Sequence, residues 1–358
     1  MFIDIANENL RILVTGGAGF IGGCLIRSLL NTTNAEIFNL DKISYASDLS
    51  WLENNKNAKR HHLINSNIAD FQETKNAIYK SNPDLIIHLA AESHVDRSID
   101  NAKPFIESNI IGTFNLLENA KSHWLSLKID KKNKFRFLHV STDEVFGTLG
   151  EEGLFNENTP YDPRSPYSAS KASSDHLVSA WFHTFKLPII RTNCSNNFGP
   201  FQFPEKLIPI IILKALNNED IPIYGDGKNI RDWLYVEDHV DALLRVLQKG
   251  EIGRTYCIGG NNQKSNIEIA NLICEKLNFK YPNNNSYKNL IKFVKDRPGH
   301  DRRYAIDSSF IKKELLWEPK TTFENGLNRT IDWYLNNLDW CRKIQNKSNY
   351  LGERLGLD

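Results

Sequence analysis

Residues 11–22 read RILVTGGAGFIG, a short apolar segment that runs directly into a cluster of glycines. The spacing predicts a strand over Arg11–Thr15, a tight glycine turn and an apolar helix over Ile21–Leu30. Gly19 lets the backbone approach a pyrophosphate closely, and Gly22 permits tight packing of the helix on the strand. Because the first turn of a helix presents N–H groups to an anion, this stretch predicts a dinucleotide-binding turn.

A carboxylate follows the glycine turn at the distance that a dinucleotide site requires. Glu36–Leu40 has the pattern of a second strand, and it ends at Asp41, about 20 residues after the glycines. An acid at this place can bind the ribose hydroxyls of adenosine and repels a 2′-phosphate, so we expect NAD rather than NADP. The adjacent Lys42 carries the opposite charge and weakens this preference. The alternative, a glycine-rich turn followed by a solvated aspartate, fits the strand, turn and helix context less well.

Strands and helices continue to alternate along the chain, which predicts a doubly wound α/β fold of Rossmann type, with a parallel sheet covered by helices on both faces. Ligands of such sheets bind beyond the carboxyl ends of the strands. The expected elements are strand His62–Asn65, helix Phe71–Ser81, strand Leu85–Ala90, helix Pro104–His123, strand Phe135–Ser141, helix Tyr167–Phe185 and strand Pro188–Arg191.

The pattern becomes irregular after Arg191, where asparagine, glycine and proline follow one another closely before an apolar helix near Leu207–Leu216. Ile230–Gln248 has the pattern of a return to the sheet domain, and the remainder is rich in asparagine and lysine. We therefore expect a smaller, sequence-interleaved C-terminal substrate domain. The predicted limits are 9–198 with a return segment 230–258 for the NAD-binding domain, and 199–229 with 259–358 for the substrate domain.

Composition argues against several classes of protein. The chain has 358 residues, with 44 Lys and Arg against 43 Asp and Glu, so no net field favours nucleic acid or an anionic membrane surface. Its five cysteines are scattered without a CxxC pair, which argues against a disulfide framework or a zinc site and favours a reducing compartment. The first ten residues lack the pattern of a secretion signal, and no apolar run reaches about 18 residues. We therefore expect a cytoplasmic protein without a bound metal, a nucleic-acid partner or a membrane segment.

A tyrosine and a lysine share one face of the predicted helix Tyr167–Phe185. Tyr167 and Lys171 are four residues apart within YSASK, and this spacing places both side chains on one side. A cation about 4–5 Å from a phenol, at an effective dielectric of about 20, supplies about the 4 kcal/mol that lowers its pKa from about 10 to about 7. We therefore expect Lys171 to lower the pKa of Tyr167, so that Tyr167 acts as a general base near neutral pH. Taken alone, such a pair is more often an exposed tyrosine beside a lysine, and the glycine turn upstream favours the functional interpretation.

Two carboxylic acids follow the strand predicted over Phe135–Ser141. Thr142, Asp143 and Glu144 precede the Tyr/Lys pair, and a plain dehydrogenase has no need of an acid and a base there. Elimination of water requires a base and an acid at adjacent carbons, and neighbouring carboxyl groups can differ in pKa through burial and mutual repulsion. Because consecutive strand residues point to opposite faces, we expect the two acids on a turn just past the strand end, where Gly147 is compatible with a bend.

Together these segments resemble the extended short-chain dehydrogenase/reductases, and most closely their dTDP-glucose 4,6-dehydratases. The resemblance covers nearly the whole chain and is carried by GGAGFIG, AAESHVDRSI, STDEVFG, YSASK, SNNFGPFQFPEKLIP, NIRDWLYVEDHVDAL and RPGHDRRYAID. The Thr-Asp-Glu triplet with RPGHDRRY is specific. A sugar-nucleotide epimerase of the superfamily shares the glycines and the Tyr/Lys pair, but is not expected to carry both acids.

The resemblance implies a reaction cycle on the sugar of a nucleotide sugar. Tyr167, supported by Lys171, takes the C4 hydroxyl proton while the C4 hydride passes to NAD, and Thr142 holds that hydroxyl. Glu144 then removes the C5 proton and protonated Asp143 donates to the departing C6 hydroxyl, before the hydride returns to C6. At any other location, the two acids would be interpreted as a helix cap or a turn pair.

The resemblance also implies which residues contact the cofactor and the substrate. The expected NAD-binding residues are Gly16, Gly19, Phe20, Ile21, Gly22, Asp41, Lys42, Tyr45, Asn67, Ile68, Leu89, Ala90, Ala91, Ser93, Ser108, Tyr167, Lys171 and Asn197. The expected substrate-binding residues are Ser93, Thr142, Asn196, Lys206, Leu207, Pro222, Tyr224, Arg231, Asn266, Arg297 and His300. Arginine suits a diphosphate because it grips phosphate oxygens with two parallel hydrogen bonds. Asn67 departs from the aspartate usual in the family and leaves a hydrogen-bonding group without charge near adenine.

Three functions are compatible with these features. The first is a dTDP-glucose 4,6-dehydratase, and the second is another nucleotide-sugar dehydratase or a 4-epimerase of the same superfamily. The third is a non-catalytic NAD-binding regulator, which has no reason to keep both acids and the Tyr/Lys pair. Superfamily resemblance further implies a homodimer packed through the helices near Pro104–His123 and Tyr167–Phe185, although their apolar faces also fit burial on their own sheet.

Overall fold

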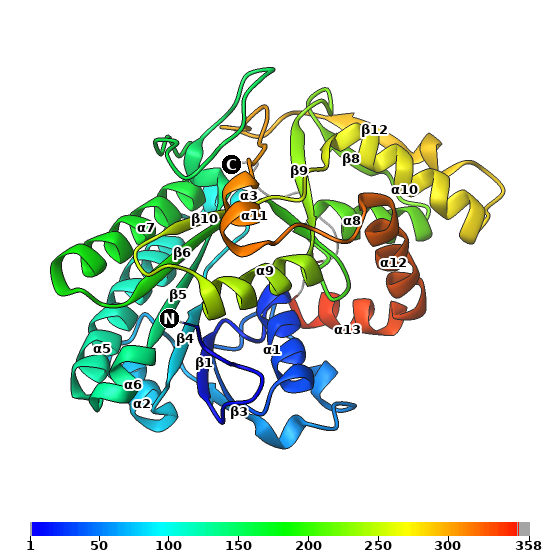
Figure 1. Cartoon of the computed structure of the whole chain (residues 1–358). Coiled ribbons are helices and arrows are strands. Elements are labelled where there is room, and N and C mark those ends of the chain that lie inside the picture. The colour runs from blue at the N-terminus through cyan, green and yellow to red at the C-terminus, as the bar shows by residue number, and fades with distance from the viewer. Residues whose placement is uncertain (1, 349, 351–358) are drawn as a thin grey trace.

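A parallel sheet of seven strands forms the centre of the structure, a computed structural model that describes residues 2–348 and 350 (Figure 1). The strands follow the order β10-β6-β5-β4-β1-β2-β3, and every neighbouring pair is parallel. Their bounds are Arg11–Thr15 (β1), Glu36–Asp41 (β2), His61–Asn65 (β3), Leu85–His88 (β4), Arg136–Thr142 (β5), Ile189–Cys194 (β6) and Thr255–Ile258 (β10). The strand order reverses between β1 and β4, as in a doubly wound Rossmann sheet, so the predicted fold class is confirmed.

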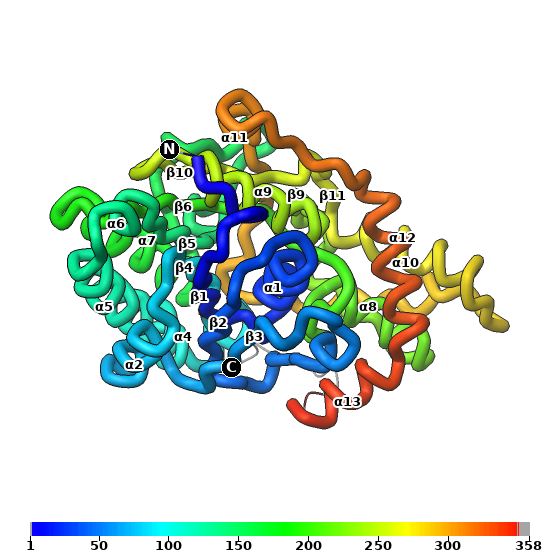
Figure 2. Tube along the Cα trace, turned by 60° about the horizontal axis from the view of Figure 1, so that its bottom comes forward, coloured from blue at the N-terminus to red at the C-terminus, as the bar shows by residue number. Residues whose placement is uncertain are grey.

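Helices cover both faces of this sheet: in Figure 2 the strands run from β10 at the top to β3 at the bottom, with helices to the left and to the right of them. One face carries α1 and α9, and the other carries α2, α5 and α7. The bounds of these helices are Phe20–Thr32 (α1), Val236–Lys249 (α9), Phe71–Ser81 (α2), Gly112–Ser126 (α5) and Pro166–Phe185 (α7). Shorter helices surround them, namely Val95–Asp100 (α3), Lys103–Phe105 (α4), Ile129–Lys134 (α6) and Ser309–Leu315 (α11).

Adjacent residues of a central strand enter separate cores on the two faces of the sheet. In β1, Ile12 and Val14 are buried in the core beneath α1 and α9, whereas Leu13 is buried beneath α2, α5 and α7. This alternation follows from the two-residue repeat of an extended chain. Because both faces are covered, the strand is an unbroken apolar run in the sequence.

A second, smaller core lies beside the sheet domain and is built mostly from late segments of the chain (Figure 1). Its helices are Leu207–Leu216 (α8), Asn266–Lys280 (α10), Phe323–Asn336 (α12) and Leu338–Ser348 (α13). Its strands are Asn196–Phe198 (β7), Ile221–Tyr224 (β8), Ile230–Tyr235 (β9), Gln263–Ser265 (β11) and Ile291–Val294 (β12). They form a three-stranded sheet, β11-β9-β7, and a parallel pair, β12-β8.

The helix expected over Pro104–His123 is interrupted in the structure. It begins as α4, passes through a π-helical segment over Ile106–Ile111 and continues as α5. Within the π-helical segment, the Asn109 amide donates to the carbonyl of Glu92 at 3.0 Å and to Ser170 Oγ at 2.8 Å. These bonds tie the irregular turn to the loop after β4, and such segments often accompany functional sites.

The segment 230–258, expected to return to the sheet domain, divides between two sheets. Strand β10 forms an edge of the seven-stranded sheet and helix α9 packs on its face, whereas β9 pairs with β7 and β11. An apolar pattern predicts that a strand forms, but the partner depends on tertiary contacts. The domain limits stay a prediction, and residues 349 and 351–358 of the last range lie outside the described residues.

None of the helices in the described part of the chain is both long enough and apolar enough to span a membrane.

Candidate active site

The glycine turn lies at the carboxyl end of β1, where the backbone passes very close to its neighbours. Gly16 has a φ of +72°, and a Cβ built there would lie 2.7 Å from the backbone of Ala90. A Cβ at Gly22 would lie 2.2 Å from the carbonyl oxygen of Gly16. Among the described residues, no side chain caps the N-terminus of α1 at Gly19, so the first N–H groups of that helix are free to bind an anion such as a diphosphate.

The carboxylate of Asp41 is fixed at the end of β2. One oxygen accepts from the Ala18 N–H at 3.0 Å, and the other accepts from the Ile43 N–H at 2.8 Å and from Ser47 Oγ at 3.1 Å. Lys42 points instead to Glu92, with 2.5 Å between its Nζ and a carboxylate oxygen. Lys42 is therefore paired with another acid, Glu92, and does not neutralise the negative charge of Asp41.

The glycine turn, Asp41 and Lys42 line a cavity of about 320 Å³ at the carboxyl ends of the strands. All residues expected to bind NAD lie on its wall, namely Gly16, Gly19, Phe20, Ile21, Gly22, Asp41, Lys42, Tyr45, Asn67, Ile68, Leu89, Ala90, Ala91, Ser93, Ser108, Tyr167, Lys171 and Asn197. The close backbone turn, the helix N-terminus and the fixed carboxylate fit a dinucleotide with an unsubstituted ribose. Which atom each residue contacts stays a proposal.

The two acids lie on a short 3₁₀ turn over Asp143–Phe146, just past the end of β5, as predicted. Thr142 Oγ1 accepts from the Glu144 N–H at 3.3 Å and holds the start of the turn. Gly147 ends it with a φ of +82°, and a Cβ there would lie 2.5 Å from the carbonyl oxygen of Asp162. The turn allows both acids to face the cavity, which consecutive strand positions do not permit.

The surroundings of Asp143 favour its protonated form. Its side chain is buried, and burial, followed by the charges of Glu144 and Asp232, raises its pKa well above the ordinary value. Among the described residues, its Oδ2 has no hydrogen-bond partner. A protonated carboxyl group with an unpaired oxygen facing a cavity is suited to donate a proton to a bound hydroxyl.

Glu144 has a different electrostatic environment. Burial raises its pKa above the ordinary value, and the opposing charges of Arg297, Arg231 and Lys206 make this rise smaller. Three cations thus favour the carboxylate form of Glu144, while a carboxylate neighbour disfavours the ionised form of Asp143. The two adjacent acids are therefore suited to opposite proton-transfer roles.

The prediction that Lys171 lowers the pKa of Tyr167 below its ordinary value is wrong. Burial and the charge of Glu144 raise the pKa of Tyr167 well above its ordinary value. Lys171 is itself buried, which lowers its own pKa, and its Nζ donates to the carbonyl of Val140 at 3.0 Å. The sequence-based argument assumed an ordinary phenol beside a cation and omitted the desolvation of both groups.

A second cavity of about 200 Å³ adjoins the first, and both are lined by Ser93, Glu144, Asn196, Glu205 and Lys206. The residues expected to bind substrate lie on the wall of the second cavity, except for Thr142 in the first. Those on the second wall are Ser93, Asn196, Lys206, Leu207, Pro222, Tyr224, Arg231, Asn266, Arg297 and His300. Cations and amides therefore surround a compartment that has Glu144 on its wall and adjoins the cavity lined by Asp143.

Comparisons with known proteins agree with this arrangement. A family model described as GDP-mannose 4,6 dehydratase matches residues 13–330. The dTDP-glucose 4,6-dehydratase of Escherichia coli is 51% identical, over 97% of this chain and 99% of the relative. That of Neisseria meningitidis serogroup B is also 51% identical, over the same shares of the two chains. The chain belongs to the dTDP-glucose 4,6-dehydratase family.

Solved structures of dTDP-glucose 4,6-dehydratases have the same fold. That of Bacillus anthracis, in complex with NAD, is 40% identical and superposes with a TM-score of 0.83 over 95% of this chain and 99% of that one. That of Streptomyces venezuelae, with NAD bound, is 37% identical with a TM-score of 0.86 over 94% and 100%.

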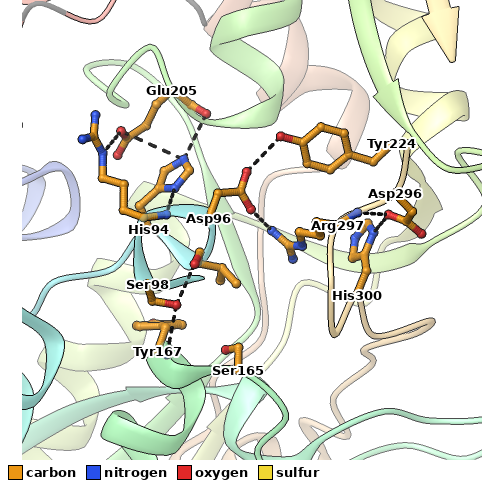
Figure 3. A network of polar contacts seen from close by, with 12 residues as sticks. His94, Asp96, Ser98, Ser165, Tyr167, Glu205, Tyr224, Asp296, Arg297 and His300 are labelled. Carbon is orange, nitrogen blue, oxygen red and sulfur yellow. Dashed lines mark hydrogen bonds and ion pairs between the residues drawn. The ribbon is translucent and has the colours of Figure 1, made fainter. Parts of the chain in front are cut away.

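In this dTDP-glucose 4,6-dehydratase family member, the second cavity is lined by an acid, Asp96, for which no role was predicted from the sequence. Asp96 receives a hydrogen bond from Arg297 at 2.7 Å and another from the Tyr224 hydroxyl at 3.0 Å (Figure 3). The hydrogen bond from Arg297 to Asp96 thus fixes the Arg297 side chain against α3, on the wall of the second cavity. Asp96 lies on α3, within the quoted segment AAESHVDRSI, and its place in that segment was the signal that the sequence offered.

A second unassigned acid joins the two cavities. Glu205 accepts from Arg97 Nε at 2.9 Å and from the Tyr45 hydroxyl at 3.1 Å. It also lies beside His94 (Figure 3). Burial lowers the pKa of His94 well below its ordinary value, so this histidine is neutral. Nothing in the local pattern around Glu205 distinguishes it from a surface acid, because its partners come from distant segments.

Proposed function

We propose that the protein converts dTDP-glucose to dTDP-4-dehydro-6-deoxy-glucose, by oxidation at C4, elimination of water across C5 and C6, and return of the hydride to C6. The observation that carries this proposal is that Asp143, Glu144 and Tyr167 line the first cavity together, and that Glu144 also lines the second. An oxidoreductase without elimination needs the tyrosine but not the two acids.

The residues of the first cavity prepare the sugar for oxidation. NAD, when bound, supplies an acceptor for the C4 hydride, a positively charged ring and the hydride that returns to C6. Tyr167 takes the proton from the C4 hydroxyl, and Thr142 orients that hydroxyl. Burial opposes the charged phenolate, so the positive charge of Lys171 is required to stabilise it when it forms.

The two acids then carry out the elimination. Oxidation at C4 makes the C5 proton acidic, and Glu144 removes it. Asp143 transfers its proton to the C6 hydroxyl, which leaves as water. Glu144 returns a proton, exchanged with solvent, to C5 when the hydride adds to C6. Arg231, Arg297 and Lys206 bind the diphosphate with charge-assisted hydrogen bonds, and this holds the sugar between the two acids.

The test is turnover of dTDP-glucose in deuterated water, followed by mass spectrometry and proton NMR. The expected product is lighter than the substrate by one water, carries solvent deuterium at C5 and forms without net accumulation of the reduced cofactor. Steady accumulation of reduced cofactor contradicts the proposal, because it shows oxidation without return of the hydride.

A second function, on another nucleotide sugar, is favoured by two of the comparisons. The matching family model is described by GDP-mannose, and the UDP-glucose 4-epimerase of Thermus thermophilus, crystallised with NAD, is 25% identical with a TM-score of 0.79. A panel of dTDP, UDP, CDP and GDP sugars distinguishes these functions. Turnover of UDP-galactose with none of dTDP-glucose assigns the protein to the second, and tight NAD binding without any turnover assigns it to a regulatory class.

We further propose that the protein is a homodimer and that it acts in the cytoplasm. Ile106, Ile111, Phe114 and Phe185 are exposed apolar side chains on the segment from α4 to α5 and on α7. Five buried, free cysteines fit a reducing compartment.

The dimer is tested by light scattering of the Phe114→Glu variant. A charge at this exposed position of α5 disfavours an apolar interface, so the measured mass falls to that of a monomer. Phe279→Glu is the matched control, because Phe279 is 87% exposed on α10 and lies outside this surface. A dimer that persists unchanged in Phe114→Glu contradicts the assignment of the interface.

A further inference from the structure

Asp175 is a buried carboxylate in the helix of the Tyr/Lys pair, and the proposed reaction leaves it without a role. It lies on α7 one turn after Lys171 and two turns after Tyr167, and it is 0% exposed. Residues spaced by four along a helix share a face, so the three side chains form one row. Burial of an isolated anion is costly, and its surroundings must therefore stabilise it.

Four side chains surround the Asp175 carboxylate with hydrogen-bonding groups. One oxygen lies 2.9 Å from His139 Nε2. The other accepts from Ser141 Oγ at 2.8 Å and from the Tyr161 hydroxyl at 2.8 Å, and Asn193 Nδ2 donates to it at 3.4 Å. These contacts act on the ionised form, and together with His139 they lower the pKa of Asp175 against the effect of burial.

The same donors join the helix of the Tyr/Lys pair to the strand that carries the Thr-Asp-Glu triplet. His139 and Ser141 belong to β5, which ends at Thr142. Asn193 of β6 also donates to the main-chain carbonyl of Thr142 at 3.0 Å. One carboxylate therefore connects α7 to the end of the strand from which the two acids project.

Among the titratable groups around Asp175, Lys171 is the cation whose protonated form the carboxylate of Asp175 favours. His139 faces it from β5 and is neutral, because burial lowers its pKa to about 4. Tyr161, before α7, is a neutral phenol because burial and the charge of Asp175 raise its pKa. Arg191 of β6 donates to the main-chain carbonyl of Asp175 at 3.2 Å. Burial lowers the pKa of Lys171, and Asp175 is the strongest of the groups that raise it.

We infer that Asp175 is a positioning residue for the dehydratase reaction, whose buried charge keeps Lys171 in the ammonium form beside Tyr167 and whose hydrogen bonds hold α7 against the end of β5. The inference rests on the proposed function, because it assigns work to the Tyr/Lys pair.

The first test is the pH profile of kcat/KM for the Asp175→Asn variant with dTDP-glucose. Asparagine keeps the size of the side chain and removes its charge, so the pKa of Lys171 falls further. The ammonium form is present below that pKa, and the alkaline limb of the profile therefore moves to lower pH. A displacement of about one pH unit corresponds to about a tenfold loss of kcat/KM on the alkaline side, with a smaller loss on the acid side. Both proteins of this comparison carry Asp143→Asn, because Asp143 also loses its proton as the pH rises. An alkaline limb that stays in place in that background contradicts the role.

Tyr161→Phe is the matched control for this profile. It removes one hydrogen bond to the Asp175 carboxylate but leaves the charge, and Tyr161 does not line either cavity. Its alkaline limb stays at the wild-type pH, even if the maximal rate falls. An equal displacement in both variants contradicts a role for the charge.

The second test measures unfolding by urea and does not depend on activity. The Lys171→Met variant lacks the cation that interacts with the Asp175 carboxylate. Asp175→Asn therefore lowers the free energy of unfolding less in Lys171→Met than in the wild type. If Asp175→Asn alone does not fold, recovery of a folded double variant shows the same coupling. If the two single variants lower the free energy of unfolding by amounts that simply add in the double variant, the inference is contradicted.

The two tests separate this inference from the proposed function. A folded wild-type protein that turns over no dTDP-glucose contradicts the function, and the unfolding cycle then still decides whether Asp175 and Lys171 are coupled. An active wild type with additive unfolding energies and an unmoved alkaline limb contradicts the role of Asp175 alone.

Discussion

At the scale of single residues, the environment of each carboxyl group separates an acid from a base. Asp143 faces Glu144 and Asp232, and these charges add to the effect of burial in raising its pKa. Glu144 faces the guanidinium groups of Arg297 and Arg231, which favour its ionised form. Neighbouring groups whose surroundings differ in this way are suited to donate and accept protons in one cycle.

We predict that Asp143→Asn and Glu144→Gln each lower the dehydration rate by about a hundredfold or more, the usual contribution of a general acid or base. Oxidation at C4 needs neither acid, so each variant still reduces its cofactor when substrate is added, which ultraviolet absorbance detects. Exchange of deuterium into C5 separates the two, because it is lost in Glu144→Gln and retained in Asp143→Asn. Dehydration at the wild-type rate in either variant contradicts the assigned roles.

A pH effect follows from the raised pKa of Asp143. The general acid is active below that pKa, so dehydration by the wild type falls as the pH rises through it. In Asp143→Asn the residual rate loses this dependence, which a pH profile of single-turnover rates measures. A residual rate with the wild-type alkaline limb assigns that limb to another group.

We predict that Arg297→Lys raises the KM for the nucleotide sugar roughly tenfold, equivalent to about 1.4 kcal/mol, with little change in kcat. Lysine keeps the charge but cannot hold Asp96 and a phosphate oxygen with the same planar geometry. Arg302→Lys is the control, because Arg302 is exposed and pairs with Asp226. Equal KM values in the two variants contradict the role of Arg297.

At the scale of elements, the glycine turn holds α1 against β1 and directs its N-terminus to the cavity. Contact is closest at Gly22, where an added Cβ would lie 2.2 Å from the carbonyl oxygen of Gly16 and 2.8 Å from the Cα of Gly17. Neither atom belongs to a flexible side chain. Relief of the clash therefore requires the helix to move away from the strand.

We predict that Gly22→Ala destabilises the protein by about 1–3 kcal/mol, the usual cost of overpacking, and weakens NAD binding because the start of α1 is displaced. Urea unfolding and calorimetric titration with NAD measure the two effects. Gly150→Ala is the control, since nothing lies within 4 Å of a Cβ at that position. NAD affinity equal to that of the control contradicts the role of the close contact.

The sequence predicted local elements well and their irregular parts poorly. The strand Arg11–Thr15 and the helix Phe71–Ser81 were predicted with the bounds that the structure has, since both follow from the local apolar pattern. The π-helical segment over Ile106–Ile111 was missed, because the hydrogen bonds of Asn109 that accompany it reach residues far away in the sequence. The pairing of Ile230–Tyr235 was missed for the same reason.

At the scale of the whole molecule, burial of neutral histidines makes the fold sensitive to acid. His139 and His239 are 0% exposed, and burial lowers their pKa values to about 4 and about 3. Burial also lowers the pKa of His88 and His94. In the unfolded chain each takes up a proton near pH 6.5, so the folded protein loses stability as the pH falls from there toward 4.

We predict that the free energy of unfolding falls as the pH is lowered from about 7 to about 5, by up to about 1.4 kcal/mol per pH unit for each such histidine. His239→Gln is neutral at every pH and reduces this loss, which urea titrations at the two pH values measure. His183→Gln is the control, because His183 is exposed. An equal loss in both variants contradicts the contribution of His239.

The sequence by itself determined the Rossmann sheet, the position of the glycine turn and the turn that carries Asp143 and Glu144. These features depend on backbone conformation and on residues close together in the chain. Only the tertiary structure decided the pKa shift of Tyr167, the pairing of Asp96 with Arg297 and the network around Asp175. Burial and charge at each of these groups come from segments far apart in the sequence, and desolvation outweighs the local spacing from which the pKa of Tyr167 was predicted.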